Sequence, residues 1–300
     1  MKPWIIRTWP AVFLLPLLLV PSCERVDTEP EPEVVYTGEL EEKYAAEGPY
    51  AVEMSRHPVD DETVKRYQVW YPLEMEKSSE RWPLVVMANG TDMPASSYKD
   101  VFRHLASWGF IVVGTEDKYA WSGKTCSQSL DFVLGLNEDP ESIFYGKVDP
   151  DAVGIAGHSQ GGVAVFNALT GYDNGSRYKA AVSASCPGKV QAGLLSWTYD
   201  VSKVRVPLLL TAGTGLIDAT VICPLETVQA NFDSARSVPV AMGRKTGIDH
   251  GDMLREGEAY LAAWFLFWLR GDTLAANCFL GETAEILHND RWQDTASRDL

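Results

Sequence analysis

The residues with the clearest chemical potential lie in the pentapeptide Gly157-His158-Ser159-Gln160-Gly161, which has the form G-x-S-x-G. An apolar run at 152–156 precedes it and an Ala/Val/Phe-rich run at 163–169 follows it, a pattern that predicts a strand, a sharp turn and a helix. Such a turn holds its serine in a strained backbone conformation with the hydroxyl exposed, and glycine is needed where side chains would collide. The pattern predicts Ser159 as the nucleophile of an acyl transfer; an ordinary glycine-rich turn is the alternative reading.

A serine hydroxyl is a weak nucleophile unless a neighbouring base accepts its proton. His250 lies in the loop 246–252, between the predicted strand 238–242 and a predicted helix at 256–269. That position is the carboxyl edge of the predicted sheet, where Ser159 also falls. The other histidines are weaker candidates, because two precede the serine, one should point away along the turn and one lies in a polar tail (His57, His104, His158 and His288). We therefore predict His250 as the base.

The base needs an acid that fixes its tautomer, and in this arrangement the acid falls between the serine and the histidine in sequence. Asp218 is the first acidic residue after the predicted strand 206–211, and the next is Glu226. An aspartate that only forms a turn is the alternative interpretation. Asp249 is a rival, although adjacent side chains in a loop usually diverge, and Asp252 is a weaker one. We predict Asp218 as the acid.

Two backbone N–H groups are needed to hold the oxyanion that forms during acyl transfer. The residue after the nucleophile, Gln160, supplies one in this kind of turn. The loop after the predicted strand 83–88 reads Asn89-Gly90-Thr91-Asp92, and the Thr91 N–H is the expected second donor. Asn89 or Asp92 would shift that assignment by one residue.

The coarse pattern of the chain alternates strands with helices, which predicts a doubly wound, mostly parallel sheet flanked by helices. Only about twenty residues, 185–205, join two successive strands where a lid domain would need several times that length. The active site should therefore be open, without a large lid domain. The expected strands are 67–71 (in a hairpin with 50–56), 83–88, 110–114, 152–156, 180–184, 206–211 and 238–242, and the expected helices are 97–108, 127–136, 160–169 and 256–269.

These features together resemble the Ser-His-Asp alpha/beta hydrolases over residues 48–270, and in particular the cutinase-like and dienelactone-hydrolase-like branch that includes polyester-degrading hydrolases. The resemblance implies an alpha/beta-hydrolase fold and ester hydrolysis through a covalent acyl-enzyme. Two departures bear on the substrate. Polyester hydrolases of this kind usually have His-Gly where this chain has Asn89-Gly90, and Met where it has Gln160.

An open cleft favours short-chain, aryl or polymer-end esters over long lipids. Tyr119 and Trp121, after the strand 110–114, and Trp197 are candidate substrate-binding residues; packing in the core is the alternative for each. The same three catalytic residues would also serve a carbohydrate (acetyl or feruloyl) esterase or an amidase or peptidase. A non-catalytic binding module with this fold is the alternative of another class. No metal or organic cofactor is expected.

The N-terminus has the pattern of an export signal. Lys2 and Arg7 precede an apolar stretch of about ten residues at 11–20, and Pro21, Ser22 and Cys23 follow. Residues 20–23 resemble a lipobox, so we expect 1–22 to be a signal peptide and Cys23 to be lipidated in a bacterial lipoprotein of the cell envelope, with secretion or a periplasmic location as the alternative. Residues 23–47 are acidic and contain prolines, which predicts an extended tether before a catalytic domain at 48–300.

The charge balance indicates which partners to expect, and the number of cysteines bears on the cellular compartment. The 300 residues carry 26 basic and 41 acidic side chains, a net charge of −15, which disfavours nucleic acid and leaves a lipid anchor as the only expected membrane contact. Four cysteines remain after Cys23, none of them at zinc-ligand spacing. In an exported protein this even number suggests two disulfides, with buried free thiols as the alternative (Cys126, Cys186, Cys223 and Cys278).

Overall fold

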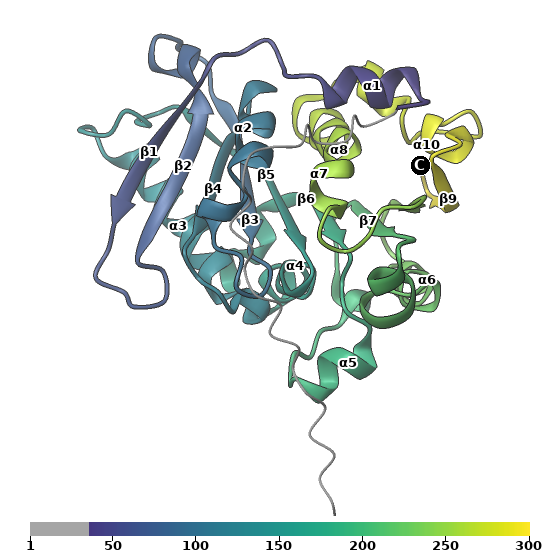
Figure 1. Ribbon diagram of the computed structural model, residues 1–300. Coiled ribbons are helices and arrows are strands. Elements are labelled where there is room, and N and C mark those ends of the chain that lie inside the picture. Colours follow the sequence, from purple (N-terminus) through teal and green to yellow (C-terminus); the bar gives the residue numbers. More distant parts are fainter. Residues whose placement is uncertain (1–35) are drawn as a thin grey trace, which may run out of the picture. The chain divides into compact units, whose positions relative to one another are not determined.

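The structure is a computed structural model, and it describes residues 36–300 (Figure 1). The predicted signal peptide, Cys23 and the first part of the predicted tether lie outside the described residues. None of the helices within residues 36–300 is long and apolar enough to cross a bilayer.

One mixed sheet of nine strands organises the described residues, in the order β1-β2-β4-β3-β5-β6-β7-β8-β9. The strands β4, β3, β5, β6, β7 and β8, which are neighbours in this order, run parallel to one another. Strands β1, β2 and β9 pair antiparallel at the two edges. This is the predicted alpha/beta-hydrolase arrangement. The strands are β1 (Val52–Pro58), β2 (Arg66–Pro72), β3 (Trp82–Ala88), β4 (Ile111–Thr115), β5 (Val148–His158), β6 (Tyr178–Ala184), β7 (Leu208–Gly213), β8 (Val240–Lys245) and β9 (Trp292–Arg298).

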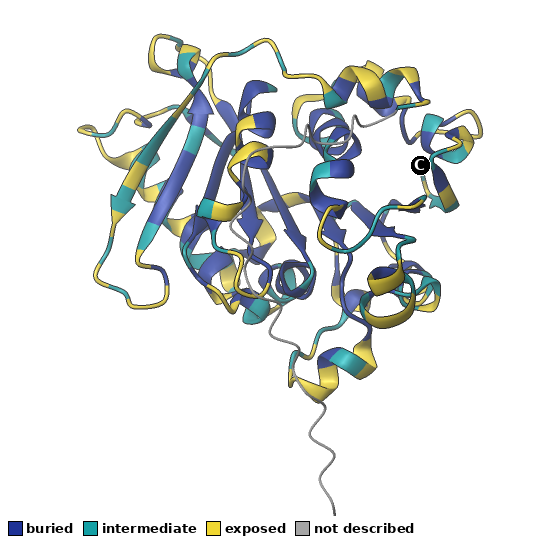
Figure 2. Ribbon diagram, viewed as in Figure 1, coloured by how far each residue is buried: buried dark blue, intermediate teal, exposed yellow. Residues whose placement is uncertain are grey.

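The central strands are apolar because helices cover both faces of the sheet, as a parallel sheet requires. Every residue of β3, β4 and β7 is buried, and Figure 2 shows these strands almost wholly in the buried colour. Helices α3 (Lys124–Glu138), α4 (Gln160–Gly171) and α6 (Leu225–Ser234) pack with one apolar cluster. Helices α2 (Lys99–Ser107), α7 (Met253–Glu256) and α8 (Glu258–Arg270) pack with the cluster on the other face.

Residues 36–47 correct the predicted boundary of the tether. Residues 39–45 form the helix α1 (Glu39–Ala45) against α8, and its Tyr44 is fully buried. The Glu41 carboxylate is fully buried as well and accepts hydrogen bonds from Lys245 Nζ at 3.0 Å and Trp292 Nε1 at 2.8 Å. The acidic composition of this segment suggested a solvated chain, but one of its acids pairs with a lysine 204 residues away.

The chain continues beyond the last strand that we predicted, 238–242. Helices α9 (Thr273–Ala276) and α10 (Glu285–His288) follow α8, and the polar strand β9 then pairs with β8 at the edge of the sheet. The connection at 185–207 holds only the short helix α5 (Lys189–Leu194) and one 3-10 turn, Val201–Lys203. No lid domain is inserted at this point.

The predicted disulfides are wrong for this structure, in which all four described cysteines are buried free thiols. Cys278 belongs to the apolar cluster on the α8 face, whereas the other three belong to the cluster on the opposite face, so the sheet separates it from them. Burial raises the pKa of both Cys126 and Cys186 to about 12, which keeps these thiols protonated at neutral pH.

Candidate active site

Ser159 occupies the sharp turn between β5 and α4, as its pentapeptide predicts. Its backbone has φ 59° and ψ −124°, a conformation that non-glycine residues rarely adopt. A Cβ atom on Gly157 would lie 2.2 Å from the Gly161 carbonyl oxygen, and one on Gly161 would lie 2.2 Å from the Ala88 carbonyl oxygen. Gly157 is therefore needed for the tightness of the turn itself, and Gly161 for the close approach of the turn to β3.

The side chains of Ser159, His250 and Asp218 are hydrogen-bonded in a row. His250 Nε2 lies 2.9 Å from Ser159 Oγ, and His250 Nδ1 lies 2.7 Å from Asp218 Oδ1. The His250 side chain is 19% exposed and that of Asp218 is fully buried, so water can reach the imidazole but not the carboxylate. The loops after β5, β7 and β8 thus bring the three predicted residues together at the carboxyl edge of the sheet.

A second carboxylate oxygen of Asp218 has its own donors. Oδ2 accepts hydrogen bonds from Ser185 Oγ at 2.5 Å and from the Gly213 N–H at 2.8 Å. Ser185 is fully buried immediately after β6 and has φ 46°, which turns its hydroxyl toward Asp218. Sequence reasoning missed Ser185, because a single serine after a strand carries no signal of its own.

The loop after β3 passes beside Ser159. A Cβ atom on Gly90 would lie 3.7 Å from the Ser159 Cβ, and the Gly90 N–H donates to the buried Tyr98 hydroxyl at 3.0 Å. The Asn89 side chain is buried and its Nδ2 donates at 2.7 Å to the carbonyl oxygens of Thr115 and Asp117. These bonds hold the segment 89–91 at the serine, where the expected oxyanion donor Thr91 belongs.

Gln160 begins α4, with Ser159 as its N-cap residue. Its fully buried side chain donates from Nε2 to Thr91 Oγ1 at 3.1 Å, so the two expected oxyanion residues are neighbours. The first N–H groups of a helix have no intrahelical acceptor and point toward the serine side of the turn. Within the described part of the chain, Gln160 Oε1 has no hydrogen-bond partner.

The His158 side chain contacts the loop that carries His250. Its Nε2 lies 2.8 Å from the backbone carbonyl oxygen of His250, and the two imidazole centroids are 4.6 Å apart. Burial lowers the pKa of His158 to about 4, so the ring is neutral at pH 7. Its side chain therefore supports His250, the predicted base.

Asp249, the rival acid, does not contact the imidazole of His250 through any hydrogen bond of the structure. Its carboxylate instead accepts the backbone N–H groups of Ile217 at 3.1 Å, Asp218 at 2.9 Å and His250 at 2.8 Å. Burial alone would raise the pKa of Asp249, but these three donors bring it below the ordinary carboxyl value.

The other two weaker candidates lie on the surface. Asp252 is 54% exposed and lies 3.7 Å from Arg255. His288 lies exposed on α10, where its Nε2 bonds to the Glu282 carbonyl oxygen.

The three aromatic candidates differ in their exposure to solvent. Tyr119 is 59% exposed and follows Lys118, whose Nζ lies 3.2 Å from the carboxylate of Asp92 beside the oxyanion loop. Trp121 and Trp197 are partly buried against the core cluster that α4 covers. The Trp121 carbonyl oxygen accepts from Asn167, two turns along α4 from the serine. Tyr119 alone among the three is largely exposed.

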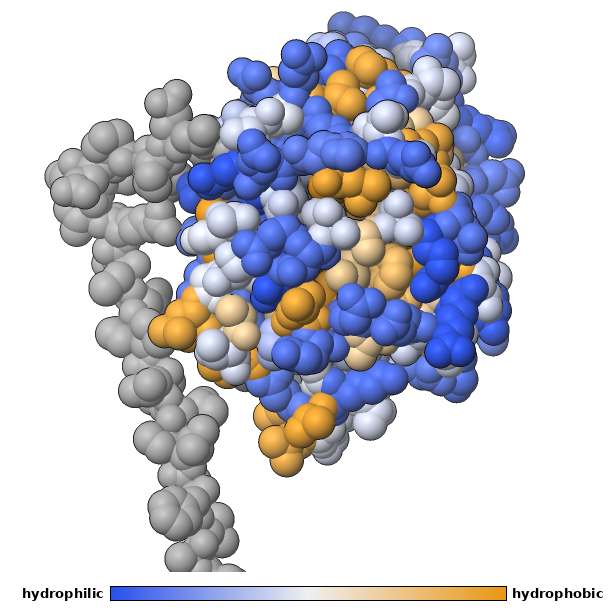
Figure 3. All heavy atoms as spheres, turned by 90° about the vertical axis from the view of Figure 1, so that its right-hand side faces the viewer, coloured by the Kyte–Doolittle hydropathy of each residue, from blue (hydrophilic) through white to orange (hydrophobic). Residues whose placement is uncertain are grey.

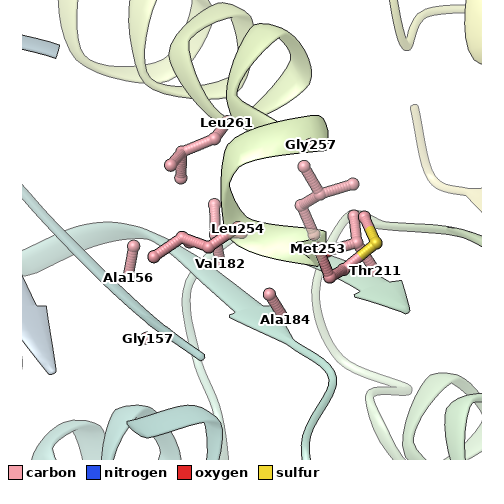
Figure 4. A pocket seen from close by; sticks show the side chains of 10 residues that line it. Ala156, Gly157, Val182, Ala184, Thr211, Met253, Leu254, Gly257 and Leu261 are labelled. Atoms are coloured by element: carbon pink, nitrogen blue, oxygen red, sulfur yellow. The ribbon is translucent and has the colours of Figure 1, made fainter. Parts of the chain in front are cut away.

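Two hollows of the described region have none of the three hydrogen-bonded residues in their lining, although Gly157 lines the first of them. A cavity of about 10 Å³ lies between the ends of β5, β6 and β7 and the helices α7 and α8, with apolar side chains such as Val182, Leu254 and Leu261 around it (Figure 4). A hollow of about 600 Å³ lies on the surface at the starts of β6 and β7, and Lys179 and Arg205 are among its lining residues.

Within residues 36–300, no three His, Cys, Asp or Glu side chains are grouped as a metal ion would require.

Comparison with known proteins identifies the family. No curated protein matches the chain. The family model described as PETase, PET hydrolase-like, matches residues 29–270, which is most of the chain and includes every residue of the site described above. This family consists of cutinase-like ester hydrolases with the alpha/beta-hydrolase fold. The chain therefore belongs to the PET hydrolase-like family.

Proposed function

We propose that this protein is a serine carboxylic-ester hydrolase that cleaves aryl, short-chain or polymer-end esters, polyesters among them. The observation that carries the proposal is the continuous row of hydrogen bonds from Ser159 Oγ through His250 to Asp218, with distances of 2.9 and 2.7 Å. Ser159, His250 and Asp218 take the roles of nucleophile, base and acid.

The first half of the reaction forms an acyl-enzyme. Ser159 Oγ attacks the ester carbonyl carbon while His250 Nε2 accepts the hydroxyl proton, and Asp218 stabilises the imidazolium through the bond to Nδ1. The N–H groups of Thr91 and Gln160 hold the oxyanion. The carbon–oxygen bond to the leaving alcohol then breaks, and His250 returns the proton to that alcohol.

The second half repeats these steps with water. His250 removes a proton from a water molecule, the resulting hydroxide attacks the acyl carbon, and the proton returns to Ser159 Oγ as the carboxylic acid leaves. Every proton in the cycle moves through one imidazole, so no metal or organic cofactor is required.

Exposed apolar side chains on two segments support an apolar, extended substrate. Val190 and Leu194 on α5 are 81% and 83% exposed, and Leu216 after β7 is 72% exposed. These segments follow β6 and β7 at the carboxyl edge of the sheet, where Ser159 also lies. Figure 3 shows apolar surface at the lower end of the molecule, where α5 lies in Figure 1. Exposed apolar groups of this kind suit binding at an apolar surface, such as that of a solid polyester.

Tyr119 and the N-terminal export signal add a substrate contact and a location to the proposal. Tyr119, exposed beside the oxyanion loop, is a proposed contact for an acyl or aryl group. Trp121 and Trp197 are weaker candidates for substrate contacts because they pack on the core. Based on its N-terminal sequence, we propose that the protein is exported with Cys23 as a lipid anchor. Such an anchor would place the enzyme at the cell envelope, outside the cytoplasm.

Labelling with a fluorophosphonate probe tests the enzyme assignment. The wild-type protein should be labelled, and Ser159→Ala should not, because the probe needs an activated serine. Hydrolysis rates on p-nitrophenyl esters from acetate to palmitate, and release of soluble acid from polyester particles, then test the substrate class. Rates should fall toward palmitate, because the connection between β6 and β7 carries no lid domain. Intact protein that resists labelling would instead favour a non-catalytic binding module.

A further inference from the structure

We infer that Asp249 is a positioning residue, whose carboxylate ties the loop of the proposed acid to the loop of the proposed base. This inference rests on the proposed function and concerns how the same site is held in its reactive geometry. Asp249 Oδ1 accepts the backbone N–H of Asp218 at 2.9 Å and that of His250 at 2.8 Å. One oxygen atom thus bonds to the main chain of both residues whose side chains must meet.

The second oxygen extends the tie into the helical turn that carries Asp218. Asp249 Oδ2 accepts the N–H of Ile217 at 3.1 Å, at the start of the turn Asp218–Ile222. A carboxylate at the first N–H groups of a helical turn satisfies donors that otherwise lack partners and interacts favourably with the turn's dipole. Asp249 therefore fixes the direction in which the turn presents the Asp218 side chain.

The two loops approach each other closely at Asp249. A Cβ atom on Gly215 would lie 2.4 Å from the Cβ of Asp249. The Gly215 N–H donates to the Ile248 carbonyl oxygen at 2.7 Å, and the Thr214 N–H donates to the Lys245 carbonyl oxygen at 3.1 Å. The main chains are thus paired up to residue 248, and the Asp249 side chain continues the pairing to Ile217 and Asp218.

The charge of Asp249 suits this role and separates it from a second catalytic acid. Its three N–H donors lower its pKa, so the carboxylate is ionised at neutral pH and accepts bonds without donating one. Both oxygens are occupied by main-chain donors, and His250 Nδ1 bonds to Asp218 instead. Loss of the Asp249 carboxylate should therefore disturb the angle between Asp218 and His250 without removing either group.

Steady-state kinetics on a soluble p-nitrophenyl ester test the inference in the full-length protein. Asp249→Ala should lower kcat about ten-fold or more and change KM less than about two-fold, because ground-state binding does not use this carboxylate. Asp249→Asn keeps one acceptor oxygen for the N–H groups of Asp218 and His250 and should recover most of the lost kcat. Asp252→Ala, which removes an exposed carboxylate from the same loop, is the matched control and should retain the wild-type rate.

A spectroscopic measurement separates this inference from the proposed function. The proton on His250 Nδ1, bonded to Asp218, should give a downfield NMR resonance in the wild type whether or not the protein hydrolyses esters. That resonance should broaden or disappear in Asp249→Ala and persist in Asp252→Ala. An Asp249→Ala protein that is folded, keeps the resonance and keeps kcat would overturn the inference, as would an Asp249→Asn protein as slow as Asp249→Ala. A wild type that shows the resonance but no ester hydrolysis would refute the proposed function alone.

Discussion

The imidazole of His158 is hydrogen-bonded to the main chain of His250, with 2.8 Å between Nε2 and the carbonyl oxygen. A carbonyl oxygen can only accept, so Nε2 carries the proton, and the neutral ring leaves Nδ1 without one. His158 precedes the proposed nucleophile in sequence but contacts the proposed base in space. It reaches the His250 loop from β5, whereas Asp249 acts from within that loop.

Replacement of His158 by phenylalanine should slow turnover. His158→Phe keeps an aromatic ring against His250 but removes the donor to its carbonyl oxygen, which leaves a partly buried acceptor without this bond at a cost of about 1–3 kcal/mol. We expect kcat on a soluble ester to fall several-fold, with a smaller change in KM. His57→Phe is the matched control, since His57 also packs on an aromatic ring, that of Phe132, but lies in β1. Equal losses in the two variants would argue against a role in holding the base.

Replacement of Ser185 by alanine should weaken the support of the proposed acid. Ser185→Ala removes the 2.5 Å hydrogen bond to Asp218 Oδ2 and leaves the Gly213 N–H as the remaining donor to that oxygen. A hydrogen bond to a charged group contributes about 1.5–3 kcal/mol, so kcat should fall about ten-fold. Ser183→Ala, which removes a buried hydroxyl from β6 that bonds to the Gly162 carbonyl oxygen, should change kcat little. A Ser185→Ala enzyme with the wild-type kcat would contradict this prediction.

The sequence predicted the parts of the fold that are marked by local apolar runs. The strand and helix around Ser159, the parallel strands and the helices α2, α3 and α8 all agree with such runs to within a few residues. The order of nucleophile, acid and base also restricted the candidates to residues that the structure brings together. In those cases the neighbouring residues alone determine the burial pattern.

What the sequence did not predict depends on pairs far apart in the chain. The like charges and prolines around α1 predict an extended tether, yet Glu41 of this helix pairs with Lys245. Strand β9 is polar and is recognisable only once β8 offers it an edge. The roles of His158 and Asp249 depend on side-chain direction in the loops, which no periodicity reports. These features could not be predicted because the residues that contact one another are far apart in the sequence.

The buried pair of Glu41 and Lys245 should make α1 necessary for stability. Glu41→Ala would leave the fully buried Lys245 ammonium near one carboxylate, that of Glu256 at 3.7 Å, and should destabilise the fold by about 3–5 kcal/mol. Lys245→Met added to Glu41→Ala removes the unpaired charge and should recover part of that loss. Urea unfolding of both variants measures the two free energies. A double variant no more stable than Glu41→Ala would contradict the ion-pair argument.

Acidification should destabilise the protein partly through His104. Burial lowers the pKa of His104 from its ordinary 6.5 to about 4, so between these values the unfolded chain binds a proton that the folded chain does not. The stability from neutral His104 is complete above about pH 6.5 and is lost as the pH falls toward 4, by up to about 3 kcal/mol. His104→Leu should flatten the dependence of the unfolding free energy on pH over this range. His288→Leu, on the exposed face of α10, should not.

The side chain of Gln160 should be dispensable for turnover, because the proposed oxyanion donor is its backbone N–H. Gln160→Met keeps that N–H and removes a buried amide whose Oε1 has no partner in the described part of the chain. We expect kcat within about three-fold of wild type and a free energy of unfolding raised by about 1 kcal/mol. The bond from Nε2 to Thr91 Oγ1 is lost as well, so Thr91→Val serves as the control that removes the same bond from the other side. If Gln160→Met lost most of its kcat while Thr91→Val did not, the amide itself would contact the substrate, and the oxyanion assignment would need revision.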